Sequence, residues 1–244
     1  MTEKLSTDEL QRIEWFDRNY ADIKARIASA CERAGRGTND VIMLAATKTV
    51  PVSVINHAIN AGVDYIGENR VQELLSKKDE LVTAAHRHFI GHLQTNKVKD
   101  IINEVEMIES VDSLKLAAEI SKQCAKFNKI MEILVEVNIG DEESKSGFQA
   151  DEVEAAIAKM AEMPNIYVKG LMSIPPICEN SQKSRQYFEK LSKLFIDIRG
   201  KNMDNVDIVY LSMGMSGDFE EAIECGSNIV RIGTALFGQR NYNK

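Results

Sequence analysis

Lys48 closes a nearly continuous apolar run over residues 41–49, a pattern typical of a strand that is buried on both faces. A lysine amine at the end of such a strand is partly desolvated, and desolvation favours the neutral form, which can attack an aldehyde. The alternative is a lysine at the rim of a sheet whose charged head reaches water past its apolar stem. Lys48 is therefore a candidate for Schiff-base formation if a nearby group can hold an aldehyde-bearing ligand.

Glycines and hydroxyl residues follow two later apolar runs, at residues 211–216 and 231–234. Ser212 and Thr234 can donate hydroxyl groups to an anion, and Gly214 and Gly233 let the backbone approach an oxygen atom closely. The alternative is that these are ordinary strand-to-helix turns, in which glycine and serine serve only the backbone geometry. A phosphate site here, beside Lys48, would suit a ligand that carries both an aldehyde and a phosphate ester.

A helix start is predicted just after the first of these turns, because Asp218 with Glu221 resembles a capping box. Backbone N–H groups at a helix start bind phosphate. Arg231 lies inside the apolar run before the second turn, where an unpaired charge would be costly. It is expected either to donate to a ligand or to form a salt bridge with a carboxylate such as Glu136.

His86, His88 and His92 follow one another at a spacing that invites a metal-site interpretation. However, His86 is expected in the loop before a strand, and no acidic or cysteine ligand follows at a metal spacing. We therefore expect no metal. Residues 145–147 (Lys-Ser-Gly) are a glycine-bearing loop that could act as a lid, and the charged run at residues 77–80 is expected to be a solvated helix face.

Strand and helix patterns alternate along the whole chain. A first helix is predicted over residues 8–34, where apolar residues recur every three or four positions before Gly35 and Gly37 end it. Pro51 can open a second helix, and further helices are expected at residues 114–127, 150–163 and 182–198. Strand-like runs occupy residues 41–49, 64–68, 88–93, 107–111, 132–138, 168–174, 207–213 and 228–237.

Eight strands alternating with helices imply an α/β fold with a parallel sheet, and eight is the number that closes as a (β/α)8 TIM-type barrel. We expect residues 1–244 to form one such domain, with an extra N-terminal helix and the site at the carboxyl ends of the strands. An open doubly wound sheet is the alternative. It usually carries a glycine-rich turn after its first strand, where this chain has Thr47-Lys48-Thr49.

The composition argues against several classes of partner. With 30 basic and 37 acidic residues the net charge is −7, so no global attraction to nucleic acid or anionic lipid is expected. The N-terminus is too charged for a signal peptide, and the longest apolar run, residues 41–46, is too short to span a membrane. The cysteines (Cys31, Cys124, Cys178 and Cys225) are widely spaced, which favours reduced thiols in a cytoplasmic protein.

Seven segments in one collinear order resemble the pyridoxal phosphate homeostasis proteins, barrel proteins related to the N-terminal domain of alanine racemase. They are ATKT at 46–49, GENR at 67–70, HFIG at 88–91, LQTNK at 93–97, GLM at 170–172, LSMGMS at 211–216 and VRIGT at 230–234.

This resemblance implies that the chain carries pyridoxal 5′-phosphate (PLP) as a reversible Schiff base on Lys48. It implies that Ser212, Gly233 and Thr234 surround the phosphate, that Arg231 faces the pyridine nitrogen and that Asn69 lies near the ring and the phosphate. It places Met213 and Gly214 in the same pocket.

The resemblance also favours a carrier over an enzyme. An arginine at the pyridine nitrogen makes the ring a weaker electron sink, which suits carrying the cofactor or limited α-proton chemistry and argues against transamination. The second domain of alanine racemase, with its catalytic tyrosine, is not expected here. We therefore expect no efficient catalysis, a monomer or weak homodimer, and apo PLP-dependent enzymes as partners. The alternatives are a slow amino-acid racemase, with Tyr65 or Tyr210 as the second base, and an aldolase that uses Lys48 on its own substrate.

Overall fold

A computed structural model describes residues 5–142, 145–176, 181–201 and 203–239. Within them, eight parallel strands follow one another in chain order around a closed barrel, and the first strand pairs with the last. The strands are β1 (Ile42–Ala46), β2 (Tyr65–Glu68), β3 (His86–Phe89), β4 (Met107–Val111), β5 (Met131–Glu136), β6 (Ile166–Met172), β7 (Val206–Met215) and β8 (Ile229–Ile232).

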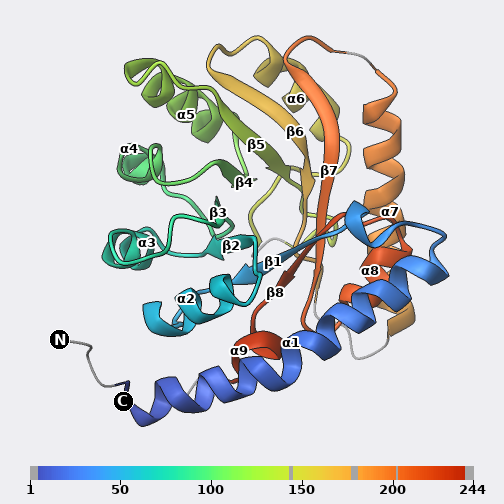
Figure 1. Ribbon diagram of the computed structural model, residues 1–244. Coiled ribbons are helices and arrows are strands. Elements are labelled where there is room, and N and C mark those ends of the chain that lie inside the picture. Colours follow the sequence, from blue (N-terminus) through green and yellow to red (C-terminus); the bar gives the residue numbers. More distant parts are fainter. Residues whose placement is uncertain (1–4, 143–144, 177–180, 202, 240–244) are drawn as a thin grey trace.

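Helices surround the barrel on its outside (Figure 1). They are α1 (Thr7–Arg33), α2 (Val52–Asn60), α3 (Val71–Lys77), α4 (Val98–Ile101), α5 (Leu114–Lys126), α6 (Val153–Ala161), α7 (Ser181–Arg199), α8 (Phe219–Glu224) and α9 (Thr234–Phe237). The predicted (β/α)8 barrel with an extra N-terminal helix is confirmed. None of the helices described combines the length and hydrophobicity that crossing a bilayer requires.

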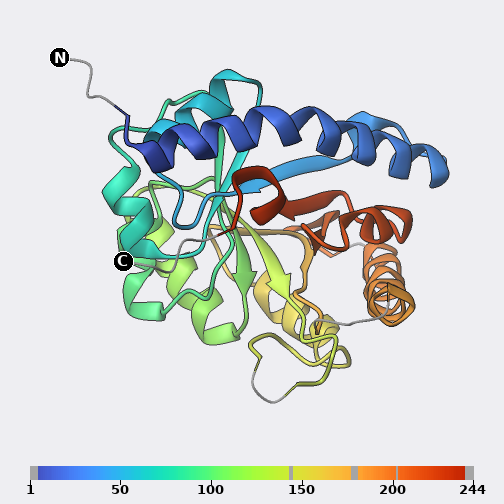
Figure 2. The same cartoon turned by 90° about the horizontal axis from the view of Figure 1, so that it is seen from below.

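Helix α1 begins and ends within one residue of its predicted bounds, 8–34. Ser6 accepts the Glu9 backbone N–H, and the Glu9 carboxylate accepts the Ser6 N–H at 2.7 Å, a complete capping box. Gly35 follows with φ of 65°, a conformation that glycine adopts without steric cost. The helix lies across one flank of the barrel, beside α2, α8 and α9 (Figure 2).

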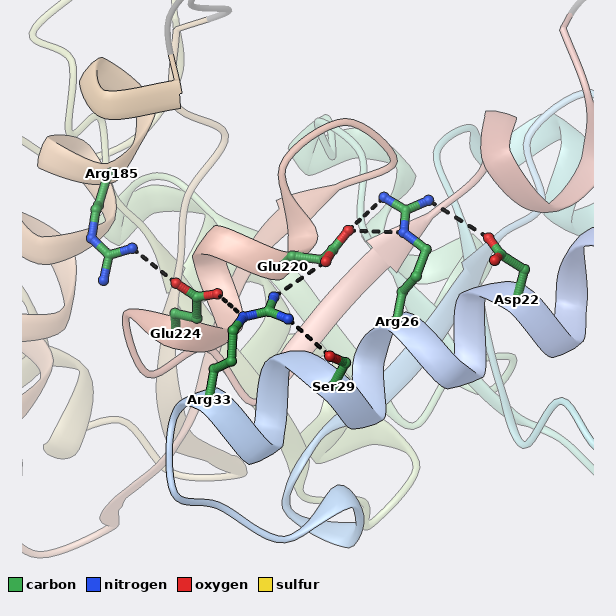
Figure 3. Close-up of polar contacts among 7 residues, drawn as sticks. All are labelled: Asp22, Arg26, Ser29, Arg33, Arg185, Glu220 and Glu224. Carbon is green, nitrogen blue, oxygen red and sulfur yellow. Dashed lines mark hydrogen bonds and ion pairs between the residues drawn. The ribbon is translucent and has the colours of Figure 1, made fainter.

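An ion-pair network fastens α1 to α8 and then to α7 (Figure 3). Arg26 contacts Glu220 at 2.7 Å, and Arg33 contacts Glu220 at 3.2 Å and Glu224 at 2.7 Å. Arg185 of α7 reaches the other oxygen of Glu224 at 3.0 Å. A single exposed ion pair contributes little to the stability of a protein, but a network of shared partners holds its side chains in one geometry. It therefore fixes α8, which follows directly on the loop after β7.

The barrel interior has its own apolar cluster, separate from the two clusters that lie between strands and helices. Leu44, Ile90, Met107, Leu134, Met172 and Ile229 belong to it, with Tyr65 and Tyr210 packed against it. Gly67 leaves room in this layer, because a Cβ there would stand 2.4 Å from the Leu44 side chain.

The structure corrects two sequence predictions of secondary structure. The last strand ends at Ile232 rather than at residue 237, because Leu236 and Phe237 donate their N–H groups to the Gly233 carbonyl and form α9. The strand predicted at residues 88–93 is β3 at His86–Phe89: it begins with His86, which pairs with Tyr65 of β2 and is not part of a loop, and it ends four residues earlier than predicted.

The charged run at residues 77–80 is only partly a solvated face. Asp79 and Glu80 are exposed, as predicted, but Lys77 is 8% exposed and makes buried contacts. The prediction for Lys77 was wrong because four consecutive charges hide which of them turns inward on a helix.

Candidate functional site

Lys48 lies just beyond the carboxyl end of β1 and is half-buried. It lines one small pocket together with its neighbour Thr49 and with Gly233 and Thr234, which follow β8. Arg12 of α1 lines the same pocket and donates to the Thr49 carbonyl at 3.3 Å. The pairing of β1 with β8 thus places the lysine directly beside the second glycine-containing turn.

Two backbone N–H groups of that turn point to one oxygen atom. Ser216, in the loop after β7, accepts the Gly233 N–H at 3.3 Å and the Ala235 N–H at 3.2 Å through its hydroxyl. Thr234, between them, is exposed. Backbone donors that converge in this way suit a phosphate oxygen. Gly233 also allows close packing, because a Cβ there would lie 3.3 Å from the Ala46 carbonyl.

The predicted capping box at α8 is not formed. Asp218 is the residue before the helix, but its carboxylate accepts the Met215 N–H at 2.7 Å instead of capping α8. Burial raises the pKa of Asp218, and this hydrogen bond opposes the rise. The side chain therefore closes the turn after β7 rather than preparing the helix start.

Met213 and Gly214 serve the packing of this segment. The Met213 side chain is fully buried in the apolar core between the barrel and its helices. Gly214 has φ of 90°, and a Cβ there would stand 2.5 Å from the Cβ of Ala222 on α8. The glycine predicted to let the backbone approach a ligand thus lets α8 approach the strand.

A chain of buried hydrogen bonds crosses the barrel and joins side chains of four strands. Arg231 of β8 donates to the Ser212 hydroxyl at 2.6 Å and to the Ser173 carbonyl at 2.8 Å. Ser212 of β7 donates in turn to Glu109 Oε2 of β4 at 2.6 Å. The other oxygen of Glu109 lies 2.7 Å from Nδ1 of His88 on β3. The hydroxyl of Ser212, predicted near a phosphate, belongs to this network.

The network compensates its own buried charges. Burial disfavours the charged form of Glu109, but the His88 hydrogen bond and the Arg231 charge outweigh it, so the pKa of Glu109 lies below its ordinary value. Burial lowers the pKa of Arg231, and the charge of Glu109 opposes that shift. A buried arginine is tolerable when carboxylates and carbonyls surround it in this way.

Glu136 stands near this network without taking the role suggested for it. The hydrogen bonds of Arg231 go to Ser212 and Ser173, so the salt bridge to Glu136 that the sequence left open is not the one formed. Burial, with the nearby charge of Asp112, raises the pKa of Glu136 to about 7, against the opposing charges of Arg231 and His92.

Asn69, which follows β2, carries a buried oxygen that is not satisfied within the described parts of the chain. Its Oδ1 atom accepts no hydrogen bond there. Such atoms are rare in folded proteins and indicate a missing partner. The oxygen and nitrogen of an amide exchange places by a simple flip, so Asn69 can offer either an acceptor or a donor to a ligand.

Each of the three histidines faces its own carboxylate. His86 lies 2.6 Å from Glu106, and His92 lies 3.0 Å from Asp112, while His88 contacts Glu109 as above. Across the described ranges, no three histidine, cysteine or acidic side chains gather as they would around a metal ion.

Contacts within the loop after β5 hold the residues on either side of positions 143–144 in place. Lys145 contacts Glu142 at 2.5 Å, and the backbone of Phe148 donates to the Glu136 carbonyl at 2.9 Å. Gly147 fits closely there, since a Cβ would lie 2.8 Å from the Asn138 nitrogen. Residues 143–144 lie outside the described part of the chain.

The two tyrosines considered as a second base lie away from the rim that carries Lys48. Tyr65 is the first residue of β2, at the amino end of the barrel, and stacks on His86 at 4.6 Å. Tyr210 precedes Ser212 by two residues and packs against the interior apolar cluster.

Glu109, His88 and Ser216 were not predicted from the sequence as members of this site. Glu109 could have been identified from the sequence, because it lies in the middle of a strand of otherwise apolar or small residues. A charged side chain buried there, like Arg231 in β8, needs a polar partner. The partners of His88 and Ser216 could not be predicted, since they come from strands and loops far away in the sequence.

Three comparisons with known proteins point to the same family. The family model described as the N-terminal domain of alanine racemase matches residues 19–241. A pyridoxal phosphate homeostasis protein of Aquifex aeolicus is 49% identical over 218 residues, covering 89% of this chain and 95% of that protein. The protein of the same name from Escherichia coli is 38% identical, covering 93% and 97%. PipY of Synechococcus elongatus, solved with PLP bound, superposes with a TM-score of 0.77 at 27% identity, covering 88% and 100%.

Proposed function

The chain belongs to the pyridoxal phosphate homeostasis protein family, and we propose that it binds PLP covalently through Lys48 and gives it up again. The observation that carries the proposal is the pocket in which Lys48 meets the turn after β8. PLP supplies an aldehyde that condenses with a primary amine, forming a C=N bond and releasing one water, in a reaction that water reverses. The chain supplies the amine and the groups that hold the rest of the molecule.

The donors after β7 and β8 suit the phosphate. The N–H groups of Gly233 and Ala235, which already bind the Ser216 hydroxyl, can donate to a phosphate oxygen in its place or beside it. Thr234 adds a hydroxyl at the same turn. The unsatisfied amide of Asn69 provides a further contact for the ring or the phosphate. We propose as cofactor-binding residues Lys48, Asn69, Ser212, Met213, Gly214, Arg231, Gly233 and Thr234. Because the Met213 side chain and Gly214 pack against the helices, these two are proposed to contribute through the backbone of the strand end.

Arg231 is the group that sets the electronic role of the ring. Its hydrogen bonds to Ser212 and Ser173 fix the plane of the guanidinium. A guanidinium has no proton-accepting atom, so at the pyridine nitrogen it leaves that nitrogen unprotonated. The ring is then a weak electron sink, which suits carrying the cofactor or limited α-proton chemistry and argues against transamination. Tyr65, at the opposite end of the barrel, does not supply the second base that a racemase requires.

We further propose that residues 1–244 form a single cofactor-binding domain that acts in the cytoplasm, as a monomer or weak homodimer. Apo PLP-dependent enzymes are the proposed recipients. The described cysteines (Cys31, Cys124 and Cys225) are free thiols, as suits a reducing compartment. Burial raises the pKa of each of these thiols, which keeps them unreactive.

The test is to add PLP, record the visible spectrum, reduce the complex with borohydride and map the modified peptide. The pyridoxyl group is expected on Lys48 and is lost in Lys48→Ala, whereas Lys99→Ala, which changes an exposed lysine, retains it. A pyridoxyl group on another residue, or on none, would contradict the proposal.

Two further assays separate a carrier from an enzyme. The loaded protein is expected to restore activity to an apo PLP-dependent enzyme, and to racemise amino acids no faster than the Lys48→Ala variant. Robust racemisation that depends on Lys48 would favour the enzyme instead.

A further inference from the structure

The turn that carries Lys48 is held from one side by a buried lysine of α3. Lys77 Nζ donates to the Thr47 carbonyl at 2.9 Å and to Glu68 Oε1 at 2.8 Å. The Thr47 hydroxyl donates to the same Glu68 oxygen at 2.7 Å. A lysine is rarely buried so deeply unless it is paired. These contacts fix the peptide group immediately before Lys48.

The peptide group after Lys48 is held from the same helix. Glu73 Oε2 accepts the Thr49 backbone N–H at 2.6 Å and lies 3.7 Å from Lys77 Nζ. Glu73 and Lys77 are four residues apart, so they share one face of α3. Thr49 has φ of 61°, which a β-branched residue adopts only when its surroundings hold it there.

We infer that Lys77 and Glu73 are positioning residues for Lys48, and that they set how readily its amine bonds covalently to the cofactor. The inference rests on the proposed function of Lys48. Condensation requires the nitrogen to approach the aldehyde carbon along a defined direction, and small displacements are costly. Two charged side chains on one helix face clamp the backbone on both sides of the reacting lysine, and neither belongs to the phosphate turns.

A loss of stability alone cannot test this inference. Burial raises the pKa of Glu68, and the charge of Lys77 opposes the rise. Removing Lys77 therefore leaves a buried carboxylate without its cation, which destabilises the fold whatever Lys48 does. The decisive quantity is the part of cofactor affinity that depends on Lys48.

A double-mutant cycle isolates that part. Lys77→Met is made with Lys48 present and in the Lys48→Ala protein. Circular dichroism first establishes conditions in which each variant is folded, and calorimetry then measures its affinity for PLP. With Lys48 present, the affinity is expected to fall about tenfold, with a matching loss of Schiff-base absorbance. In the Lys48→Ala protein, where binding is non-covalent, the change is expected to stay within about twofold.

Glu73→Gln is the second variant, because it keeps the side-chain shape and removes only the charge. It is expected to reproduce the Lys48-dependent loss and, in the cofactor-free protein, to speed the hydrogen exchange of the Thr49 amide. The matched control is Lys78→Met, the next residue along the chain, whose amine pairs with Glu104 outside this cluster. It should change PLP affinity in neither background.

Equal losses in both backgrounds would overturn the inference, because Lys77 would then support the pocket as a whole. Unchanged affinity in both would overturn it as well. Failure of the proposed function is distinguishable, since the unsubstituted protein would then carry no reducible bond at Lys48.

Discussion

At the scale of single residues, the barrel interior places a carboxylate where hydrophobic packing alone would favour an apolar side chain. Glu109 has 0% exposure, and both of its oxygens are engaged, one by His88 and one by Ser212. Through Ser212 its charge reaches Arg231. The orientation of the arginine assigned to the cofactor ring therefore depends on a residue on the opposite wall of the barrel.

Glu109→Ala is expected to lower the free energy of unfolding by about 3 kcal/mol, because it leaves Arg231 buried without its compensating charge. Urea unfolding measures the loss. Glu106→Ala, which removes the exposed partner of His86, should cost no more than about 0.5 kcal/mol. Equal losses of unfolding free energy in the two variants would show that the buried network stabilises the protein no more than an exposed ion pair does.

Glu136 gives the protein a pH-dependent stability. Its pKa rises from 4.5 to about 7 on folding, mainly through burial. Between these values the native state holds a proton that the unfolded chain has lost, so the free energy of unfolding falls as pH rises. The full effect is roughly 3 kcal/mol and is complete above pH 7.

Glu136→Gln should remove this dependence. The difference in unfolding free energy between the variant and the unsubstituted protein is expected to grow from pH 4.5 to pH 7 and then to stay constant. Urea titrations at several pH values measure it. A difference that does not change with pH would contradict the shifted pKa.

At the scale of elements, the loop after β7 is shaped by the helix that packs on it. Gly214 combines a positive φ with close contact to Ala222, and the Asp218 carboxylate closes the turn by accepting the Met215 N–H. The ion pairs of Glu220 and Glu224 hold α8 against α1 and α7 (Figure 3). The Ser216 hydroxyl is thereby fixed opposite the turn after β8.

Gly214→Ala is expected to destabilise the protein by about 2–3 kcal/mol, because the new methyl group meets Ala222 and the backbone conformation is strained. Gly217→Ala, three residues later in the loop after β7, is the matched control, since a Cβ there would have nothing within 4 Å and the φ of Gly217 is not positive. It should leave stability nearly unchanged. Thermal unfolding of both variants tests the comparison, and equal melting temperatures would refute it.

The elements themselves were largely predictable from the sequence. Apolar runs of strand length alternate with helical periods, and that alternation predicted all eight strands. The errors arose where local pattern and tertiary contact diverge: β8 continues into α9 without a change in polarity, and Lys77 turns inward from a charged run. Lys48, Gly233 and Thr234 could be placed at one rim, but the partners of Arg231 could not, because they depend on which strands meet across the barrel.

At the scale of the whole molecule, the candidate site joins the first strand to the last. Lys48 follows β1, and the turn of Gly233 and Thr234, which is proposed to bind the phosphate, follows β8. These two strands pair directly. Helix α1 packs across the same side and reaches α8 and α9 (Figure 2). A ligand that contacts both turns therefore ties together segments from opposite ends of the fold.

PLP is accordingly expected to stabilise the whole barrel and not only its rim. At about a hundredfold excess over Kd, the gain is about 2.7 kcal/mol, or roughly 5–10 °C in Tm for a chain of this size. The gain should be much smaller in Lys48→Ala. Differential scanning calorimetry measures it, and an equal gain in both proteins would show that the covalent bond adds nothing to stability.

The seam between β1 and β8 also has a consequence for biosynthesis. A ribosome synthesises β1 before β8, so Lys48 emerges long before the turn after β8 that lines the same pocket. Until then the edge of β1 that pairs with β8 has no partner strand, and the turn proposed to bind the phosphate has not been made. If the cofactor binds at the proposed site, its capture therefore requires that synthesis has passed β8 and that the barrel has closed between its first and last strands.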